Sequence, residues 1–421
     1  MPREPGHLSS SRGDALQQSW RLLEPFRQLS MLDWIRIGLL VAGVGCVVSG
    51  LLPATQAEDS ILRIMPLLLF LGSVIVLAKL AREARVFDVI AVRMAIVGRG
   101  NYVALFLFCV VFASLTTIFL NLDTTAVLLT PVMLALASRT KIAALPLAMT
   151  TIWLANTASL LLPVSNLTNL LATDRVALEA PAFAARMWLP QLATIAVTML
   201  FLWLCYWRRT QRDTDRYFPP PPLKLAKPRE RTLFAVAGTA CLLFIIAIPF
   251  IREEIGYAAF AAALIVVVAF ACFDRAKLRL SLIPWQLMIF VTGLFLVVPT
   301  LSLYGLAEVM TALIGSDHNG AQMYRVAMTG AGLSNVLNNL PAYAAGEAII
   351  PYVNVDHLLA LLIGTNVGPI VTPWASLATL LCLEACREHN LRIPLGKFVL
   401  TSFGLAVVAT TLGVGALLLT R

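Results

Sequence analysis

The chain has 421 residues, of which 59% are hydrophobic and only 13% are charged, and its net charge is +9. Soluble domains carry about 25% charged residues, so this composition excludes an ordinary water-soluble enzyme and a disordered chain. The basic residues lie between apolar runs and have no interleaved aromatics. This pattern argues against nucleic-acid binding and is typical of the cytoplasmic loops of a membrane protein.

Long apolar runs follow one another along the chain, each near the length of about 20 residues that crosses a bilayer. They are residues 35–52, 61–80, 188–206, 233–251, 258–273, 285–303 and 398–419. Because the runs are continuous and do not alternate, they predict spanning helices and not barrel strands. The polar, arginine-bearing residues 1–33 are expected to form a cytoplasmic N-terminal tail and not a cleaved signal peptide.

A basic segment at residues 207–231, with four consecutive prolines, divides the chain near its middle. Its composition predicts a stiff polar linker, and its positive charge places it in the cytoplasm. We therefore expect a leading span and a first repeat over residues 34–206. A second repeat is expected over residues 232–421.

Each half contains two hydrophobic regions that polar residues, glycine and proline interrupt. These regions are residues 114–130, 155–174, 332–346 and 363–379. Asn121 and Asn338 are 217 positions apart (338 − 121), and Asn166 and Asn366 are 200 apart (366 − 166). The similar offsets indicate an internal duplication. Interrupted spans at corresponding places in two halves point to the binding site of a secondary transporter.

The predicted fold is an all-α polytopic membrane protein with about 11 transmembrane spans, built as two repeats. A repeat with an odd number of spans places its second copy upside down, so we expect inverted repeats. Each repeat should contain a re-entrant hairpin and a broken helix. Residues 81–99 and 304–322 mix charged and apolar side chains, and they are either interfacial amphipathic arms or plain connecting loops.

Polar residues of the four interrupted regions are the candidate lining of a solute site. Unwound backbone in lipid leaves unsatisfied groups at a cost of several kcal/mol each, so it persists where it lines a cavity. For the hydroxyl and amide side chains, the alternative is polar contact between helices. The candidates are Asn121, Asp123, Thr124, Thr125, Ser165, Asn166, Thr168, Asn335, Asn338, Asn339, Thr365, Asn366 and Thr372.

Asp123 and Glu347 are the candidate proton-coupling groups. A charged side chain at mid-membrane costs roughly 2.5–3.5 kcal/mol, so a carboxyl group there favours its protonated form and can carry a proton. Asp123 could instead cap a helix, and Glu347 could lie at the membrane interface. The four regions contain no Arg or Lys, so a small neutral polyhydroxyl solute suits them at least as well as an anion.

Catalytic and metal-binding patterns are weak in this sequence. The four histidines lie in polar segments or at span edges, without metal or triad spacing. Cys382 and Cys386 are four positions apart and could together hold a soft metal, although structural zinc takes four ligands. We therefore expect no enzyme activity, no cofactor and no metal.

The interrupted regions, together with the strings PWQLMIFVTGLFLVV, NNLPAYAAG and IGTNVGPIVTPWASLATLL, resemble the arsenical pump membrane protein family. The resemblance covers nearly all of the chain from about residue 35. It implies export of arsenite and antimonite by proton antiport across the cell (inner or plasma) membrane. It also implies an optional cytoplasmic arsenite-stimulated ATPase subunit. Since the family is similar to sodium-coupled dicarboxylate transporters, it further implies elevator-type movement and a homodimer.

The chain departs from the family pattern at three positions. Asn366 and Ile370 stand where the family commonly has an acidic residue and a lysine, and Asn156 stands where it often has an aspartate. Asp123 is therefore the main remaining candidate for proton coupling. The alternatives on the same fold are a sodium-coupled anion transporter, dicarboxylate- or sulfate-like, and a cation/proton antiporter. A membrane-embedded enzyme or a non-transporting receptor is the alternative from another class.

Overall fold

The computed structural model describes residues 31–176, 178–208, 216–219, 221, 223, 225, 227–247, 255–315, 320–351 and 353–420. Helices dominate these residues, and no β-strand occurs among them. Residues 1–30 of the predicted N-terminal tail, and residues 209–215, 220, 222, 224 and 226 of the predicted linker, lie outside the described residues. The structure therefore has the all-helical architecture that the sequence predicts.

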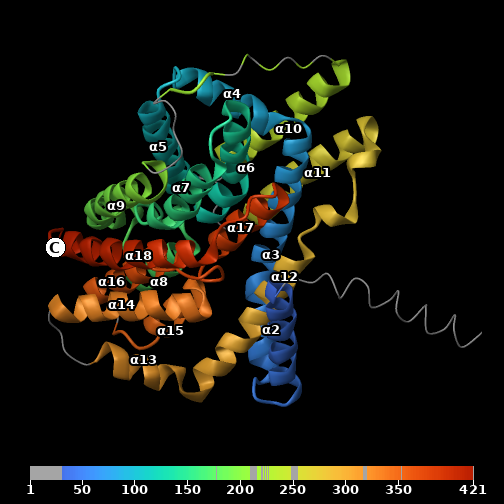
Figure 1. Cartoon of the computed structure of the whole chain (residues 1–421). Helices are drawn as coiled ribbons and strands as arrows, with labels where there is room; N and C mark the ends of the chain where they lie inside the picture. The colour runs from blue at the N-terminus through green and yellow to red at the C-terminus, as the bar shows by residue number, and fades with distance from the viewer. Residues whose placement is uncertain are drawn as a thin grey trace, which may run out of the picture.

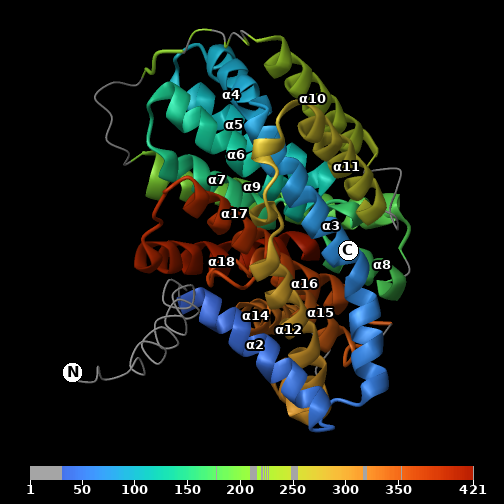
Figure 2. The ribbon, with the colours of Figure 1, turned by 90° about the vertical axis from the view of Figure 1, so that its right-hand side faces the viewer.

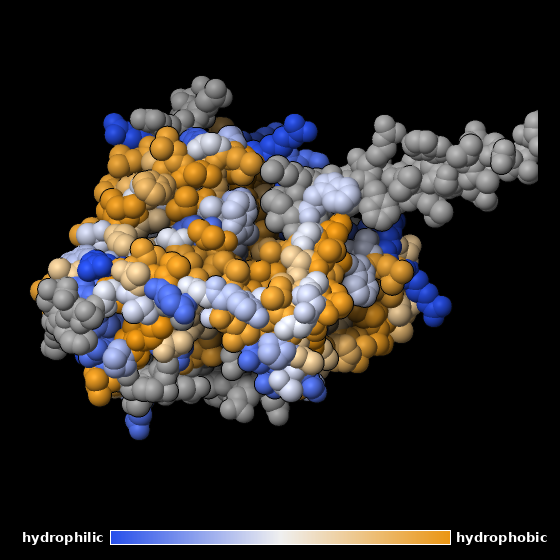
Figure 3. Space-filling model, turned by 90° about the horizontal axis from the view of Figure 1, so that it is seen from below, coloured by the Kyte–Doolittle hydropathy of each residue, from blue (hydrophilic) through white to orange (hydrophobic). Residues whose placement is uncertain are grey.

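Eight of the helices in the described ranges are long and apolar enough to cross a membrane. They are α3 (Ala54–Glu83), α5 (Tyr102–Leu120), α6 (Leu122–Thr140), α9 (Ala180–Leu202), α10 (Pro228–Ala247), α11 (Ile255–Phe273), α12 (Trp285–Leu301) and α18 (Leu395–Leu418). Hydrophobic residues also make up much of the molecular face in Figure 3. A surface of this kind is suited to contact with lipid.

The helices divide into two groups, seen on the right and left of Figure 1. In the first, which we call the five-helix group, α2 (Met31–Val48) packs on α12, α11 packs on α3, and α10 packs on α11. Figure 2 shows α2, α3 and α12 running beside one another. The second, which we call the hairpin group, contains the interrupted regions and consists of α5 to α9 and α14 to α18.

Each half of the hairpin group begins with two helices joined by a single asparagine. Asn121 joins α5 to α6, and Asn338 joins α14 (Gly320–Leu337) to α15 (Asn339–Glu347). Both asparagines have positive φ, with φ 130° and ψ 171° at Asn121 and φ 116° and ψ 156° at Asn338. Glycine adopts this backbone region freely and other residues rarely do. The two tips therefore share a strained geometry at the pair of positions that the sequence aligned.

A broken helix follows each of these helix pairs, as the sequence predicts. In the first half, α7 (Ala144–Thr157) ends well before α8 (Leu167–Val176), with a short 3-10 turn between them. In the second half, α16 (Val355–Val367) is likewise separated from α17 (Leu377–Glu388). The interruptions coincide with the proline-containing strings, where proline cannot continue a helix.

The halves differ in the number of long helices that precede the first asparagine tip. In the described residues, α2 and α3 precede α5, whereas α10, α11 and α12 precede α14. A short helix stands before each hairpin: α4 (Val86–Val97) packs on α6, and α13 (Ala307–Ile314) packs on α14. These two helices occupy the segments expected to be amphipathic arms or loops.

Small residues allow α16 to lie directly against α14. A Cβ at Gly364 would overlap the carbonyl oxygen of Ala327, and a Cβ at Gly368 would overlap Ala331. Gly364 and Gly368 are four positions apart, as are Ala327 and Ala331, which is the small-residue spacing typical of close helix contacts in membranes. This contact fixes the second break against the second hairpin.

Candidate functional site

The hairpin tips and the breaks meet at a small cavity of about 30 Å³. Four of the predicted site residues line it: Asp123, Asn166, Asn338 and Asn339. Its remaining wall is apolar and comes from both helix groups, with Leu122, Leu167, Leu340 and Leu377 on one side and Phe290, Val291, Leu294 and Phe295 of α12 on the other. The cavity therefore lies at the boundary between the hairpin group and the five-helix group.

Asp123 lies in the first turn of α6 and is 3% exposed. Its Oδ1 atom has no hydrogen-bond partner. The cap of α6 is made by Asn121, whose Oδ1 accepts the backbone N–H of Thr124 at 2.7 Å. A negative charge is favoured near a helix N-terminus, and an unpaired buried oxygen is available to a ligand. Asn121 therefore caps α6 with its side chain, and the side chain of Asp123 lines the cavity instead.

The first break is held by Gln191 of α9. Its Oε1 accepts the backbone N–H groups of Leu160 and Leu161, at 2.7 and 3.1 Å, and its Nε2 donates to the carbonyl of Thr157 at 3.1 Å. One side-chain amide thus satisfies three backbone groups that the end of α7 leaves without helical partners. Unwound backbone in the apolar interior would otherwise be costly.

Asn335 of α14 holds the second break in the same way. Its Oδ1 accepts the N–H groups of Val371 and Thr372, at 3.1 and 3.0 Å, and its Nδ2 donates to the carbonyl of Gly368 at 2.9 Å. The hydroxyl of Thr372 donates in turn to the carbonyl of Asn335. Two predicted solute ligands, Asn335 and Thr372, therefore contact each other and the break in this structure.

Side chains also join the two breaks to each other. The hydroxyl of Thr168 donates to Oδ1 of Asn366 at 2.5 Å, and Nδ2 of Asn366 donates to Oδ1 of Asn169 at 2.6 Å. Asn169 in turn donates to the carbonyls of Ser159 and Leu162. All of these side chains except Leu162 are buried. The network ties α8 of the first half to α16 of the second, and the backbone N–H of Thr168 also donates to Asn166, which lines the cavity.

The other predicted residues lie near the tips and breaks with partners of their own. Thr125 accepts a hydrogen bond from Thr117 at 3.2 Å, Ser165 donates to the carbonyl of Ile118 at 2.7 Å, and Thr365 donates to the carbonyl of Leu361 within its own helix. Thr124 is fully buried, and its hydroxyl has no partner. Glu347, at the end of α15, is half-buried and is not among the residues that line the cavity. Cys382 accepts a hydrogen bond from Thr130 at 3.2 Å.

Gln191 supports the first break but is not among the site residues predicted from the sequence. The only signal was a lone amide within the long apolar run of α9, which is as common at ordinary helix contacts in membranes. Its partner segment lies about 30 positions earlier in the chain, so no local pattern connects the two.

Known proteins resemble this chain over most of its length. The family model described as citrate transporter matches residues 29–355. The arsenical pump membrane protein of Yersinia enterocolitica is 30% identical over 350 residues, which is 78% of this chain and 80% of that protein. The Escherichia coli K12 protein of the same name is 29% identical with the same coverage. A solved structure, the YdaH transporter of Alcanivorax borkumensis, superposes with a TM-score of 0.48 at 15% identity, over 88% of this chain and 89% of that chain. The chain therefore belongs to the citrate transporter family together with the arsenical pump membrane proteins, and it is a multi-pass membrane transporter.

Proposed function

We propose that this transporter exports arsenite and antimonite from the cytoplasm by proton antiport. The observation that carries the proposal is the position of Asp123, which alone carries a charge among the described residues lining the small cavity. Its Oδ1 is free of hydrogen bonds. Antiport needs one group that alternates between protonated and ionised forms as access switches, and a buried carboxyl group can do so.

The lining of the cavity favours a small neutral solute. Trivalent arsenic at neutral pH is As(OH)₃, which is uncharged and carries three hydroxyl groups. The amides of Asn166, Asn338 and Asn339 can both donate to hydroxyl groups and accept from them. A cavity of about 30 Å³ has the room of two or three water molecules, since a single water needs about 10–15 Å³, so its size favours a small solute over a large one. The names of the arsenical pump relatives support the same solute.

A tricarboxylate fits this lining less well. Carboxylate recognition usually relies on Arg or Lys, and neither occurs among the described residues that line the cavity. The citrate transporter description of the family model nevertheless supports a second candidate function. This is the sodium-coupled transport of an organic or inorganic anion, in which carbonyls and amides at the breaks would coordinate sodium.

Alternating access is proposed to arise from movement of the hairpin group along the five-helix group, as in an elevator. The small cavity draws its polar residues from the hairpin group and its apolar wall of Phe290, Val291, Leu294 and Phe295 from α12. Movement of one group past the other would carry the solute across an apolar surface. On this proposal the protein is a homodimer in the inner or plasma membrane, with the N-terminus and the linker in the cytoplasm, where an arsenite-stimulated ATPase subunit would dock.

Purified protein in liposomes with an acidic lumen tests the proposal. Proton efflux should drive accumulation of arsenite, measured by mass spectrometry of arsenic, and a protonophore should abolish the accumulation. A sodium gradient alone should have no effect. Absence of pH-driven arsenite uptake, with sodium-driven uptake of citrate or sulfate in the same preparation, would establish the second candidate function instead.

A further inference from the structure

A second and larger cavity, of about 420 Å³, lies between α2, α3, α6, α12 and α17. Unlike the small cavity, it is rich in charge. The charged and titratable side chains along its wall are Arg36, Lys79, Arg82, Glu384, Glu388 and His389. Neither the fold nor the proposed solute site accounts for this concentration of charge at the boundary of the two helix groups.

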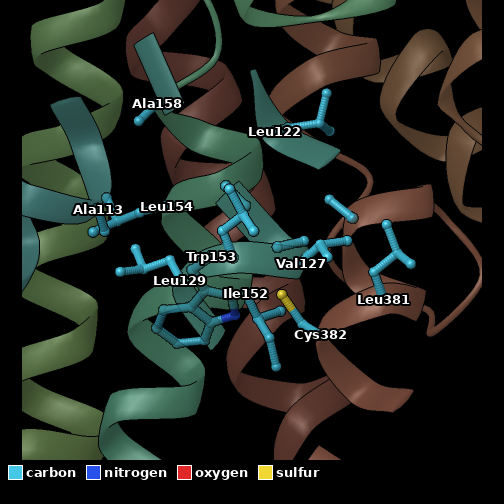
Figure 4. Close-up of a cluster of buried hydrophobic side chains, with 14 of the residues drawn as sticks. Ala113, Leu122, Val127, Leu129, Ile152, Trp153, Leu154, Ala158, Leu381 and Cys382 are labelled. Carbon is cyan, nitrogen blue, oxygen red and sulfur yellow. The ribbon is translucent and has the colours of Figure 1, made fainter. Parts of the chain in front are cut away.

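Three helices line both cavities at successive turns. On α6, Asp123 lines the small cavity and Val127 lines the large one. On α17, Leu377 lines the small cavity and Leu381 lines the large one. On α12, Phe290 lines the small cavity and Leu287 the large one. The buried apolar side chains of Val127, Leu287 and Leu381 therefore belong to the wall of the charged cavity and lie about one helical turn from residues that line the small cavity. Figure 4 shows Val127 and Leu381 on their neighbouring helices.

Ion pairs cross the large cavity from one helix group to the other. Glu384 of α17 lies 3.3 Å from Arg36 of α2, and Glu388 of α17 lies 3.0 Å from Lys79 and 3.3 Å from Arg82 of α3. Arg36 is only 5% exposed and also donates to Gln286 of α12 at 3.3 Å. These contacts fix the C-terminal half of α17, in the hairpin group, against the five-helix group.

The pairs of Glu388 with Lys79 and Arg82 are partly exposed, and such pairs contribute little individually to the stability of a fold. This weakness suits a contact that forms in one state of a cycle and breaks in the next. By contrast, the hydrogen bonds of Asn366 with Thr168 and Asn169 are buried and join elements within the hairpin group. The location of all three ion pairs, and the weakness of the two that Glu388 makes, fit a reversible contact between the groups.

We propose that the charged cavity is the route by which water and solute reach the Asp123 cavity from one side of the membrane, and that the ion pairs of Glu384 and Glu388 with Arg36, Lys79 and Arg82 hold the state in which this route is open. The inference rests on the proposed function in one respect, the movement of the hairpin group relative to the five-helix group. On this proposal, the apolar side chains of Val127, Leu287 and Leu381 form the inner barrier between the route and the site.

Chemical labelling of a cysteine in the cavity wall tests the proposal. Ala385 lines the large cavity beside Glu384, so Ala385→Cys in the full chain reports whether the route is open. Its rate of reaction with N-ethylmaleimide is followed in proteoliposomes by tandem mass spectrometry, which separates it from Cys382 and Cys386. Arg36→Glu and Glu384→Arg should each slow this reaction about two- to fivefold, because like charges then face each other across the cavity.

The double reversal Arg36→Glu with Glu384→Arg should restore the rate to within about twofold of the parent. Lys277→Glu is the matched control, because Lys277 pairs with Glu83 of α3 at 2.5 Å without involving the hairpin group, and it should leave the rate unchanged. A direct effect of charge on the cysteine would shift the two single reversals in opposite directions. A shift in opposite directions, unchanged rates, or no recovery in the double variant would overturn the proposal.

Amounts in the membrane and elution in size exclusion show whether each variant folds. If the reversals fail to fold, Glu388→Gln removes one charge from a partly exposed side chain and should still slow labelling. An unchanged rate in Glu388→Gln would also overturn the proposal. Because labelling uses no transported solute, its outcome is separate from arsenite uptake, which is measured in the same liposomes. If the protein shows no arsenite transport but gives the expected labelling pattern, the proposed solute is wrong and the proposed access route is supported.

Discussion

Gln191 and Asn335 each hydrogen-bond the unwound backbone of a helix break, one in each half of the hairpin group. Each side-chain amide accepts two consecutive backbone N–H groups of a break and donates to a carbonyl at the end of the preceding helix. Gln191 reaches its break from the helix that follows, whereas Asn335 reaches its break from the hairpin that precedes. The two halves thus arrive at one solution for unwound backbone with residues at unrelated positions.

Replacing either amide should destabilise the protein strongly. Gln191→Leu and Asn335→Leu each leave three backbone groups without partners, at about 1–3 kcal/mol per group, so we expect losses of about 3 kcal/mol or more. The measurement is the apparent melting temperature in detergent and lipid. Asn101→Ala is the calibrating control, because Asn101 caps α5 at an exposed position and such a cap contributes about 1 kcal/mol. Losses no larger than that of the control would contradict the assignment.

The asparagine tips make a separate prediction about backbone strain. At Asn338, glycine should be more stable than alanine by about 1–3 kcal/mol, because φ 116° and ψ 156° lie in a region that glycine alone adopts freely. Both substitutions remove the hydrogen bond from Nδ2 to the carbonyl of Trp374, so the difference between them isolates the backbone. Asn121→Gly and Asn121→Ala should differ in the same sense. Equal melting temperatures for glycine and alanine would show that the tips carry no strain.

Much of this architecture was predictable because the signals are local. Clusters of Asn, Gly and Pro within an apolar run favour an interruption of the helix, and the breaks and the tips at Asn121 and Asn338 lie within the four regions that such clusters mark. The function of each polar side chain was not predictable in the same way. Asn335 and Asn338 are three positions apart and both bind the backbone of the second break, yet only Asn338 also lines the cavity. That difference depends on contacts with residues more than 30 positions away. Solute binding by the predicted residues stays a prediction.

Thr168 provides a test of the link between the halves. Thr168→Val removes the hydroxyl that donates to Oδ1 of Asn366. Because that buried oxygen then lacks this hydrogen bond, the free energy of unfolding should fall by about 1–3 kcal/mol. Thr151→Val is the matched control, since Thr151 is equally buried but donates only to the carbonyl of Leu147, one turn back, at 3.4 Å. The melting temperature should fall clearly more in Thr168→Val. Similar losses in both variants would mean that the contact between α8 and α16 contributes little.

Asp123→Asn separates solute binding from proton coupling. The amide is nearly isosteric with a protonated carboxyl group but cannot release a proton, so uptake of arsenite driven by an acidic lumen should fall to the level of protein-free liposomes. Exchange of labelled for unlabelled arsenite, which needs no net proton movement, should persist because the rest of the cavity is unchanged. Asp88→Asn is the control and should retain pH-driven uptake. Asp88 of α4 pairs with Arg139 of α6 at 3.1 Å and is not among the residues lining the small cavity. Full pH-driven uptake by Asp123→Asn would exclude Asp123 as the coupling group, and coupling would then have to involve a residue outside the small cavity, of which Glu347 is the first to test.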